Sequence, residues 1–141
     1  MASSRTETGI TWSSAASVTL SSAAASTSDA FTFNAEDWDA DLAVHADNQG
    51  TPASGDVVNI RVAYSVGNID GSAGDDYATT EHAEYIGKLD TWSTNTPGED
   101  PAMMVFPIRT TAKAVRLVVD APQGASRSIV VRAGIITHRP Q

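Results

Sequence analysis

The chain has 141 residues, which is enough for one domain with a substantial hydrophobic core, and it contains no cysteine. Disulfides, cysteine-ligated zinc and thiol chemistry are therefore excluded. The net charge of −8 disfavours binding to nucleic-acid phosphates, and no apolar run approaches the roughly 20 residues that cross a bilayer. No signal-peptide pattern opens the sequence, so we expect a protein that is made in a cytoplasm, or is assembled there into something larger.

The first 28 residues are rich in serine, alanine and threonine, and they contain two short apolar alternations. Ile10 and Trp12 flank one polar residue, and Val18 and Leu20 flank another, which is the period of an extended strand. We interpret this segment as an arm that adds strands to a neighbouring surface. The alternatives are a frayed terminus and completion of the domain's own sandwich by Ile10 and Trp12. The expected division is an arm at 1–28 and a β-sandwich domain at 29–141.

The strongest strand signal is a run of four apolar residues that alternate with other residues and so share one face. Six further runs follow the same rule, and Pro107 in one of them favours an edge strand. In chain order the runs are Phe31/Phe33, Leu42/Val44, Val58/Ile60/Val62/Tyr64 (the strongest), Ala83/Tyr85/Leu89, Met104/Phe106/Ile108, Val115/Leu117/Val119 and Ile129/Val131/Ala133/Ile135.

Turn-forming residues separate these runs, with glycine, proline, asparagine and aspartate gathered at 48–55, 67–76, 93–101 and 122–124. No stretch shows sustained helical periodicity, and only residues 34–38 predict a single helical turn. Seven to nine short strands without substantial helices predict an all-β fold. We expect a β-sandwich of jelly-roll or Greek-key type with an extended N-terminal arm.

Candidate catalytic and metal-binding residues are few. His45, His82 and His138 lack the close spacing of a zinc site, and we expect each on the outer face of a strand. The acidic loop at 68–76 offers oxygen ligands around a glycine, but its spacing does not fit an EF-hand. A solvated turn is the simpler interpretation, and a different kind of calcium site stays open. We expect a protein that is not an enzyme, with no catalytic residue, cofactor or metal.

Aromatic residues and charges leave two further questions open. Trp38 and Trp92 lie among polar turn residues, where we expect them to cap the ends of the core; the alternative is a platform for sugars. Of the 17 acidic residues, 15 lie between Asp29 and Asp100, whereas six of the nine basic residues follow Pro101. The simpler interpretation is that the acids are solvated and the arginines pair with them within the fold. Alternatively, the divided charge docks further copies of the chain or a charged lattice.

Several turn-and-strand segments resemble one family when they are taken in order. They are 47–56, which runs into the strongest strand, then 75–83, 89–91, 112–117 and 128–137. Together they are similar to small β-sandwich proteins encoded among the virion genes of tailed bacteriophages, which are often head decoration or cement proteins. The resemblance covers residues 40–139 and carries over no catalytic residue.

The resemblance implies a non-enzymatic virion structural protein on the phage head surface that binds and stabilises the capsid lattice. The expected partners are the lattice of the major capsid protein and further copies of this chain in a homo-oligomer, with no nucleic acid and no membrane. The alternatives are a tail- or connector-associated virion component and a carbohydrate-binding β-sandwich module. The candidate partner-binding residues are Ile10, Trp12, Val18, Leu20, Arg127 and Arg132.

Overall fold

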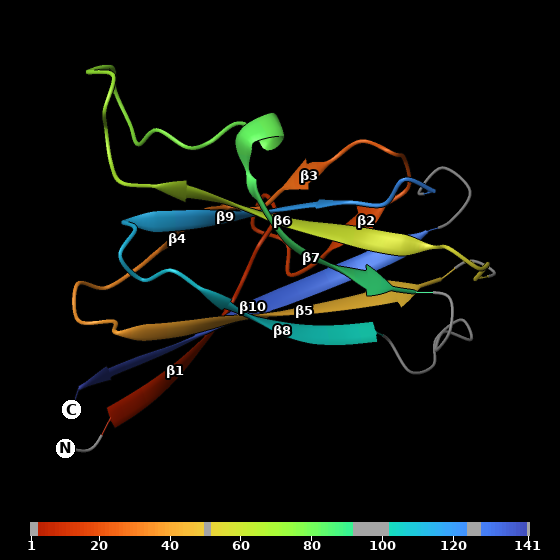
Figure 1. Cartoon of the computed structure of the whole chain (residues 1–141), viewed down its shortest axis with the longest axis horizontal. Coiled ribbons are helices and arrows are strands. Elements are labelled where there is room, and N and C mark those ends of the chain that lie inside the picture. The colour runs from red at the N-terminus through yellow and green to blue at the C-terminus, as the bar shows by residue number, and fades with distance from the viewer. Residues whose placement is uncertain (1–2, 50–51, 92–101, 124–127, 141) are drawn as a thin grey trace.

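The computed structural model describes residues 3–49, 52–91, 102–123 and 128–140, and these residues form two antiparallel β-sheets packed face to face (Figure 1). The expected β-sandwich is confirmed. None of the described residues belongs to a helix long and apolar enough to cross a membrane. The only helical element among them is a short 3₁₀ turn, η1 (Thr80–His82), which the sequence pattern did not predict.

The first sheet, here called the β5 sheet, has the strand order β1-β10-β5-β8. Strands β1 and β2 pair in turn with successive parts of β10, so they share one position at the edge of this sheet. Its strands are β1 (Ser3–Gly9), β2 (Val18–Leu20), β5 (Asp39–Asn48), β8 (Ala102–Ile108) and β10 (Ile129–Pro140).

The second sheet, here called the β6 sheet, has the order β3-β9-β6-β7, and β4 shares the position of β3 beside β9. With β1/β2 and β3/β4 counted as one position each, the chain fills four positions in each sheet. From β5 onward it follows a jelly-roll path, because β6 and β7 lie in one sheet and β8, β9 and β10 then alternate between the two. The strands of the β6 sheet are β3 (Ser26–Thr27), β4 (Phe31–Thr32), β6 (Val57–Ser65), β7 (Glu84–Asp90) and β9 (Ala114–Asp120).

The core lies between the sheets and is built from the alternating residues that the sequence predicts. Val58, Ile60 and Val62 of β6 are buried against Leu42 and Val44 of β5 in one continuous cluster. Tyr64, the fourth residue of the predicted face, is half-buried at its end, and burial raises the pKa of its hydroxyl. That hydroxyl accepts a hydrogen bond from the backbone N–H of Arg109 at 3.0 Å.

The predicted N-terminal arm is not separate from the sandwich. Ile10, Trp12 and Leu20 are buried in the core of their own chain, and Val18 is half-buried against it. Ser28 holds the chain in place where it passes to the β6 sheet. Its backbone N–H donates to the carbonyl of Leu117, and its hydroxyl oxygen accepts from the N–H of Leu117. The division at residue 28 and the arm are therefore wrong, and the alternative in which these residues complete the sandwich is confirmed. The physical reason is that, among the described strands, β1 and β2 cover the edge of β10 that β5 leaves free.

Strand β7 departs from the simple alternation because it contains a bulge. Ile60 pairs with Gly87, whereas the next residue, Arg61, pairs with Tyr85, so one residue of β7 is skipped. Leu89 consequently points into the core, but Tyr85 lies on the outer surface, and the expectation that they share a face is wrong. Gly87 permits the close approach of β8, since a side chain there would meet the ring of Phe106 at 2.6 Å.

Residues 34–38 form a hydrogen-bonded turn and not the helical turn that the sequence predicts. The backbone N–H of Asp37 donates to the carbonyl of Asn34 at 3.0 Å, and the Asn34 side chain accepts from Glu36. The side chain of Asp37 is fully buried and lies 2.9 Å from the guanidinium of Arg139. This ion pair joins the turn between β4 and β5 to the end of β10 (Figure 1).

Candidate functional site

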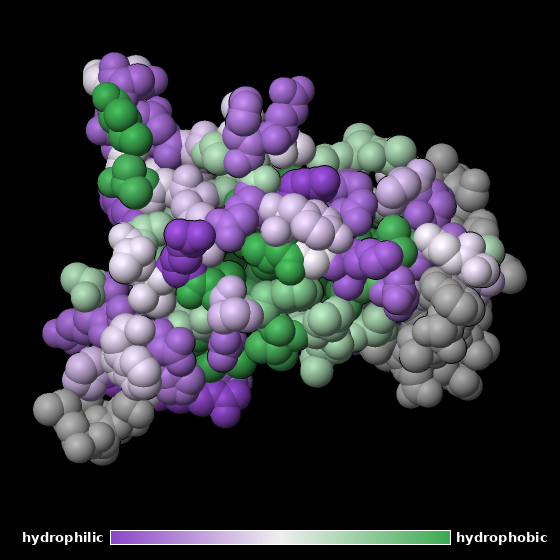
Figure 2. All heavy atoms as spheres, viewed as in Figure 1, coloured by the Kyte–Doolittle hydropathy of each residue, from purple (hydrophilic) through white to green (hydrophobic). Residues whose placement is uncertain are grey.

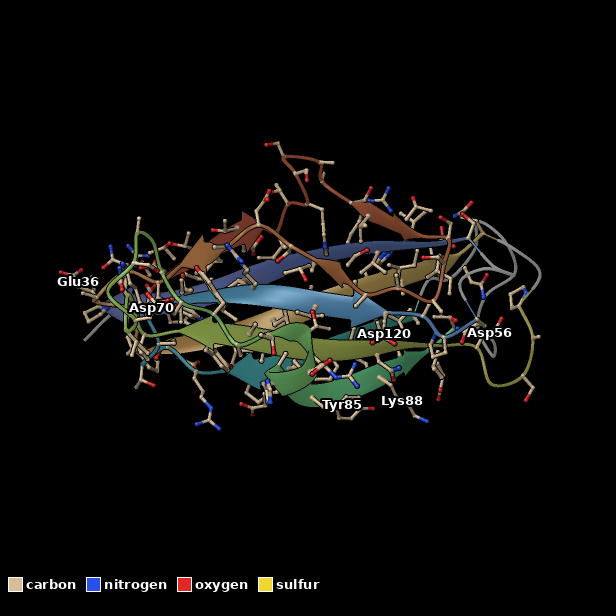
Figure 3. All side chains as sticks on the ribbon, turned by 90° about the horizontal axis from the view of Figure 1, so that it is seen from above. Glu36, Asp56, Asp70, Tyr85, Lys88 and Asp120 are labelled. Carbon is tan, nitrogen blue, oxygen red and sulfur yellow. The ribbon has the colours of Figure 1, made fainter. Side chains whose placement is uncertain are left out.

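The outer face of the β6 sheet is covered by the 66–83 loop. Ala63, Val118 and Ala83 form a small buried cluster beneath it, although two of them point away from the main core. Tyr77 holds the loop down by stacking on Arg116, whose guanidinium carbon lies 4.0 Å from the ring centroid. Figure 3 shows this loop, which carries Asp70, running over the sheet, with Tyr85 and Lys88 on the β7 edge.

An ion pair also joins the same loop to the residue that precedes β9. Lys113 donates to Asp75 at 2.8 Å, and this bond raises the pKa of the lysine. Within the loop the carboxylates serve the backbone, because Asp76 accepts from the N–H groups of Ile69 and Asp70 at 2.6 and 3.0 Å. Asp70 in turn accepts from the N–H and the hydroxyl of Ser72, which lowers the pKa of Asp70. The loop is therefore a self-bonded cover for the β6 sheet.

The outer face of the β5 sheet is open on its described residues. Residues that pair between neighbouring strands form rows across it. Three neighbouring rows run across the strands at right angles to the chain direction, in the order β1, β10, β5, β8. The first row is Glu7, Ile136, Asp41 and Pro107; the second is Gly9, Gly134, Ala43 and Val105; the third, without β1, is Arg132, His45 and Met103.

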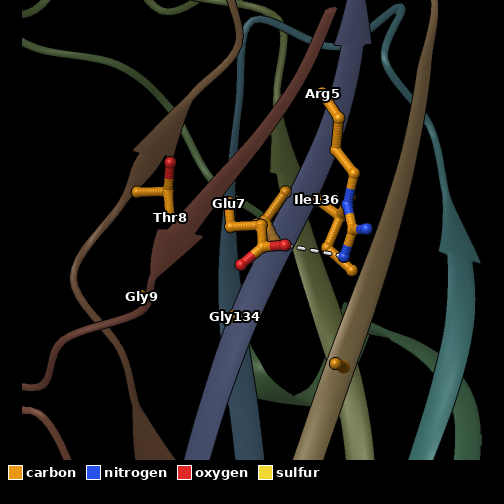
Figure 4. Close-up of a pocket in the computed structure, with 8 residues that line it drawn as sticks. Arg5, Glu7, Thr8, Gly9, Gly134 and Ile136 are labelled. Atoms are coloured by element: carbon orange, nitrogen blue, oxygen red, sulfur yellow. Dashed lines mark ion pairs between the residues drawn. The ribbon is translucent and has the colours of Figure 1, made fainter.

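The second row is the floor of a groove, because three of its four residues are glycine or alanine. Two adjoining hollows of about 460 and 280 Å³ share Ala43 and Gly134 in their lining. The first extends to Gly9, Glu7 and Arg5 and is drawn in Figure 4, where an ion pair of 2.7 Å joins Arg5 to Glu7 beside Ile136. The groove thus crosses the sheet from β1 towards β8.

The two walls of the groove differ in charge. The wall formed by the first row carries the carboxylates Glu7, which is paired with Arg5, and Asp41; the opposite wall carries the guanidinium of Arg132 beside the imidazole of His45. Rows two residues apart on a strand are separated by about 7 Å, so the walls stand roughly 14 Å apart. This width suits an extended chain that offers polar groups to both sides, and the walls add apolar contacts from Ile136 and Met103.

The two glycines on the floor are not required by the backbone or by packing within the chain. Neither has a positive φ. A side chain at Gly9 would meet nothing within 4 Å, and one at Gly134 would meet only the carbonyl of Thr8 at 3.4 Å. Glycine inside a strand destabilises it by about 0.5–1 kcal/mol relative to alanine. A glycine in a strand often marks a bulge, a tight bend or a place where a ligand or another backbone approaches closely.

Trp38 stands beyond the acidic wall, at one end of the same face. Its side chain is 58% exposed, so the expectation that it caps the core is wrong. Its ring lies 5.8 Å from that of His138, and its backbone N–H donates to the His138 carbonyl. A hollow of about 720 Å³ at this end of the sandwich is lined by Trp38 together with Phe33, Val66 and Lys113. Trp92, the second predicted cap, lies outside the described residues.

The predicted partner-binding residues fall into three groups. Ile10, Trp12 and Leu20 are inside the core and are not available to a partner. Arg132 is exposed and lines the groove on the wall opposite Glu7. Val18 is half-buried, and Arg127 lies outside the described residues.

The histidines do not meet. His45 and His138 lie on the outer face of the β5 sheet, as expected, but His82 lies in the 3₁₀ turn and bonds to Thr79. His138 is 3.6 Å from Asp39. Across the described parts of the chain, no three acidic or histidine side chains gather closely enough to hold a metal ion.

No protein-family model matches the chain, and no curated protein matches it by sequence. Its fold is similar to the CBM36-1 domain of a multidomain xylanase from the hindgut metagenome of Trinervitermes trinervoides, with a TM-score of 0.50 and 11% identity over 94% of this chain and 96% of that one. Less similar are a family 29 carbohydrate-binding module from Piromyces equi (0.47, 10%, 96% and 80%) and the cyanophage Pam1 capsid asymmetric unit (0.42, 17%, 98% and 86%). At these identities the likeness shows the β-sandwich fold alone.

Proposed function

We propose that this protein is a non-enzymatic binding module whose groove on the β5 sheet docks an extended segment of a protein lattice, as a capsid decoration or cement protein does. The observation that carries the proposal is the pair of adjacent glycines, Gly9 and Gly134, on the floor of an open face. The fold does not need them, whereas a chain lying across the strands does.

The lining of the groove favours a polypeptide as the occupant. Acidic and basic walls can hold the polar backbone and charged side chains of an extended segment, and Ile136 and Met103 can bury its apolar ones. No aromatic side chain lines either hollow of the groove, so the stacking platform that sugar rings favour is missing there. The resemblance of residues 40–139 to small virion proteins agrees with a lattice as the partner. A ligand that binds only the assembled shell stabilises it by mass action.

The test fills the groove without harming the fold. Gly9→Val places a β-branched side chain where nothing lies within 4 Å, so the melting temperature is expected to stay or rise. Binding to the matching expanded capsids, measured by co-sedimentation, is expected to fall at least tenfold. Thr19→Val is the matched control, because Thr19 is exposed on β2 of the same sheet but does not line the groove. Equal binding by both variants and the wild type would refute the proposal.

A second candidate function is binding of glycans, and the observation that favours it is the exposed Trp38. It lies beside His138 and near the end hollow, which gives one stacking surface with polar neighbours. The CBM36-1 domain, a module named for carbohydrate binding, has the same fold, although the low identity leaves its ligand without weight for this chain.

A glycan array separates the two candidates. Glycan binding that is lost in Trp38→Ala and retained in Tyr85→Ala would establish the second function, since Tyr85 is equally exposed but lies on the opposite sheet. No binding by the wild-type chain to any glycan would remove this candidate and leave the proposal of a protein lattice intact.

A further inference from the structure

The edge strands of the two sheets are not protected equally. An edge strand presents unpaired N–H and C=O groups, and proteins usually blunt it with charges, bulges or short length. Strand β1 carries the charged pair Arg5 and Glu7, and β7 carries Glu84, Lys88, Asp90 and a bulge. Strands β3 and β4 have two residues each.

Strand β8 has none of these protections apart from Pro107 near its end. Its seven residues carry no charge, and among the described strands it pairs only with β5. Met103, Met104 and Val105 are 64%, 45% and 51% exposed, which places three consecutive large apolar side chains on one free edge. Figure 2, which faces this side of the sandwich, shows apolar surface in green over the β7–β8 region.

We infer that β8 is a self-association edge, on which β8 of a second copy pairs antiparallel about a two-fold axis at Val105. A neutral strand is suited to its own copy, because pairing brings no like charges opposite one another. The two β5 sheets then form one continuous sheet, in the isologous contact typical of two-fold dimers.

In this arrangement the rows on the flanking strands place no like charges opposite one another. Pairing about Val105 sets Met103 opposite the partner's Pro107, since each lies two residues from the axis. The row of Arg132 and His45 therefore continues into the partner's row of Asp41 and Glu7. His45 and the partner's Asp41 stand about three strand spacings apart, roughly 14 Å, which exceeds the Debye length at physiological ionic strength, so the apolar strand supplies the attraction.

The dimer also joins the two grooves end to end. The floor row of Gly9, Gly134 and Ala43 ends at Val105, which meets the partner's Val105, and the floor then continues through the partner's Ala43. A single groove would span both copies, and a long ligand could contact two binding sites at once. The association itself does not depend on what the groove binds.

Sedimentation equilibrium of the full chain tests the inference. The wild type is expected to pass reversibly from its monomer mass of 14.7 kDa to twice that mass as the concentration rises. Val105→Lys adds the charge that other edges carry and is expected to raise the dissociation constant at least tenfold, as is Met103→Lys. Ile69→Lys is the matched control, because Ile69 is an exposed apolar residue, 73% accessible, in the loop on the other sheet.

Thermal melting of each variant shows whether it is folded. If one of the two edge variants misfolds, the other still tests the inference. A wild-type chain that remains a monomer at millimolar concentration would overturn the inference. Equal weakening by Ile69→Lys and Val105→Lys would also overturn it. Either failure leaves the capsid-binding test with Gly9→Val unaffected, so the two proposals can fail separately.

Discussion

The two outer faces of the sandwich differ in whether a loop of the chain covers them, although the strands beneath them are alike. The β6 sheet carries the 66–83 loop, and Ala63 and Val118 are buried under it. The β5 sheet has no such cover on its described residues, and Ala43, at a comparable place on the central strand β5, lies in the floor of a groove. The comparison teaches that the chain folds its own long loop onto one face and leaves the described part of the other face exposed.

The largest expected effect comes from removing the segment that completes the open face. Deletion of residues 2–26 removes β1 and β2 and takes Ile10, Trp12 and Leu20 out of the core. Each buried side chain contributes about 1.5–3 kcal/mol, and a domain is stable by only about 5–15 kcal/mol. We expect loss of the cooperative melting transition in circular dichroism. A truncated chain that melts at the wild-type temperature would show that the open face does not need this segment.

A matched pair of alanines tests whether the faces differ as the structure indicates. Ala63→Lys puts an unpaired charge into the closed contact beneath the loop, with an expected loss of about 3 kcal/mol or more in the free energy of unfolding. Ala43→Lys places the same side chain in the open groove, where the lysine reaches water, and the expected loss is below about 1 kcal/mol. Urea titration measures both. Similar losses for the two variants would remove the distinction between the faces.

A smaller effect on stability is expected from removing a contact that holds the 66–83 loop on the β6 sheet. Tyr77→Ala removes the ring that stacks on Arg116 at 4.0 Å, with an expected cost of about 1 kcal/mol and faster proteolysis within residues 66–83. Tyr85→Ala is the control, because Tyr85 is half exposed and the guanidinium carbon of Arg61 lies farther from its ring, at 5.4 Å. Its expected effect is close to zero. If Tyr77→Ala leaves proteolysis unchanged, the stacking does not hold the loop.

The smallest effect concerns the crossing of the chain between the sheets, where Asp29 holds the tight turn at 12–15. Its carboxylate accepts from the Thr11 hydroxyl at 2.6 Å and from the backbone N–H groups of Ser14 and Ser13 at 3.0 and 3.3 Å. The Thr11 bond is the main cause that lowers the pKa of Asp29. Ser13 and Ser14 both have positive φ, at 46° and 70°, which serine rarely adopts.

Because the folded pKa of Asp29 lies below its unfolded value, the stabilisation is present above the unfolded pKa and is lost as pH falls through the folded one. The protection of the Ser14 amide from exchange, relative to the intrinsic rate at each pH, is therefore expected to fall in acid, below the usual range of an aspartate. Asp29→Asn should remove that acid dependence while it leaves the rest of the sandwich unchanged. An identical pH profile in the variant would assign the change to other carboxylates.

Much of the fold follows from local patterns in the sequence. Val58, Ile60 and Val62 alternate cleanly, and they are buried together as their spacing predicts. Pro107 predicts an edge strand, and β8 is one among the described strands. Gly134 lies inside a predicted strand pattern, where an isolated glycine marks a bulge or a close approach, whereas Gly9 precedes the first predicted run. Nothing local, however, indicated that Gly9 would lie opposite Gly134.

The sequence by itself determined that this chain is a β-sandwich, since alternation with period two fixes which side chains leave water. Only the tertiary structure decided which strands are neighbours. That choice brought Ile10 and Trp12 into the core, exposed Trp38, turned Tyr85 outward through the β7 bulge and aligned Gly9, Gly134 and Ala43 across three strands. Register between strands far apart in sequence depends on pairing and packing over the whole sandwich, and no short window of residues contains that information.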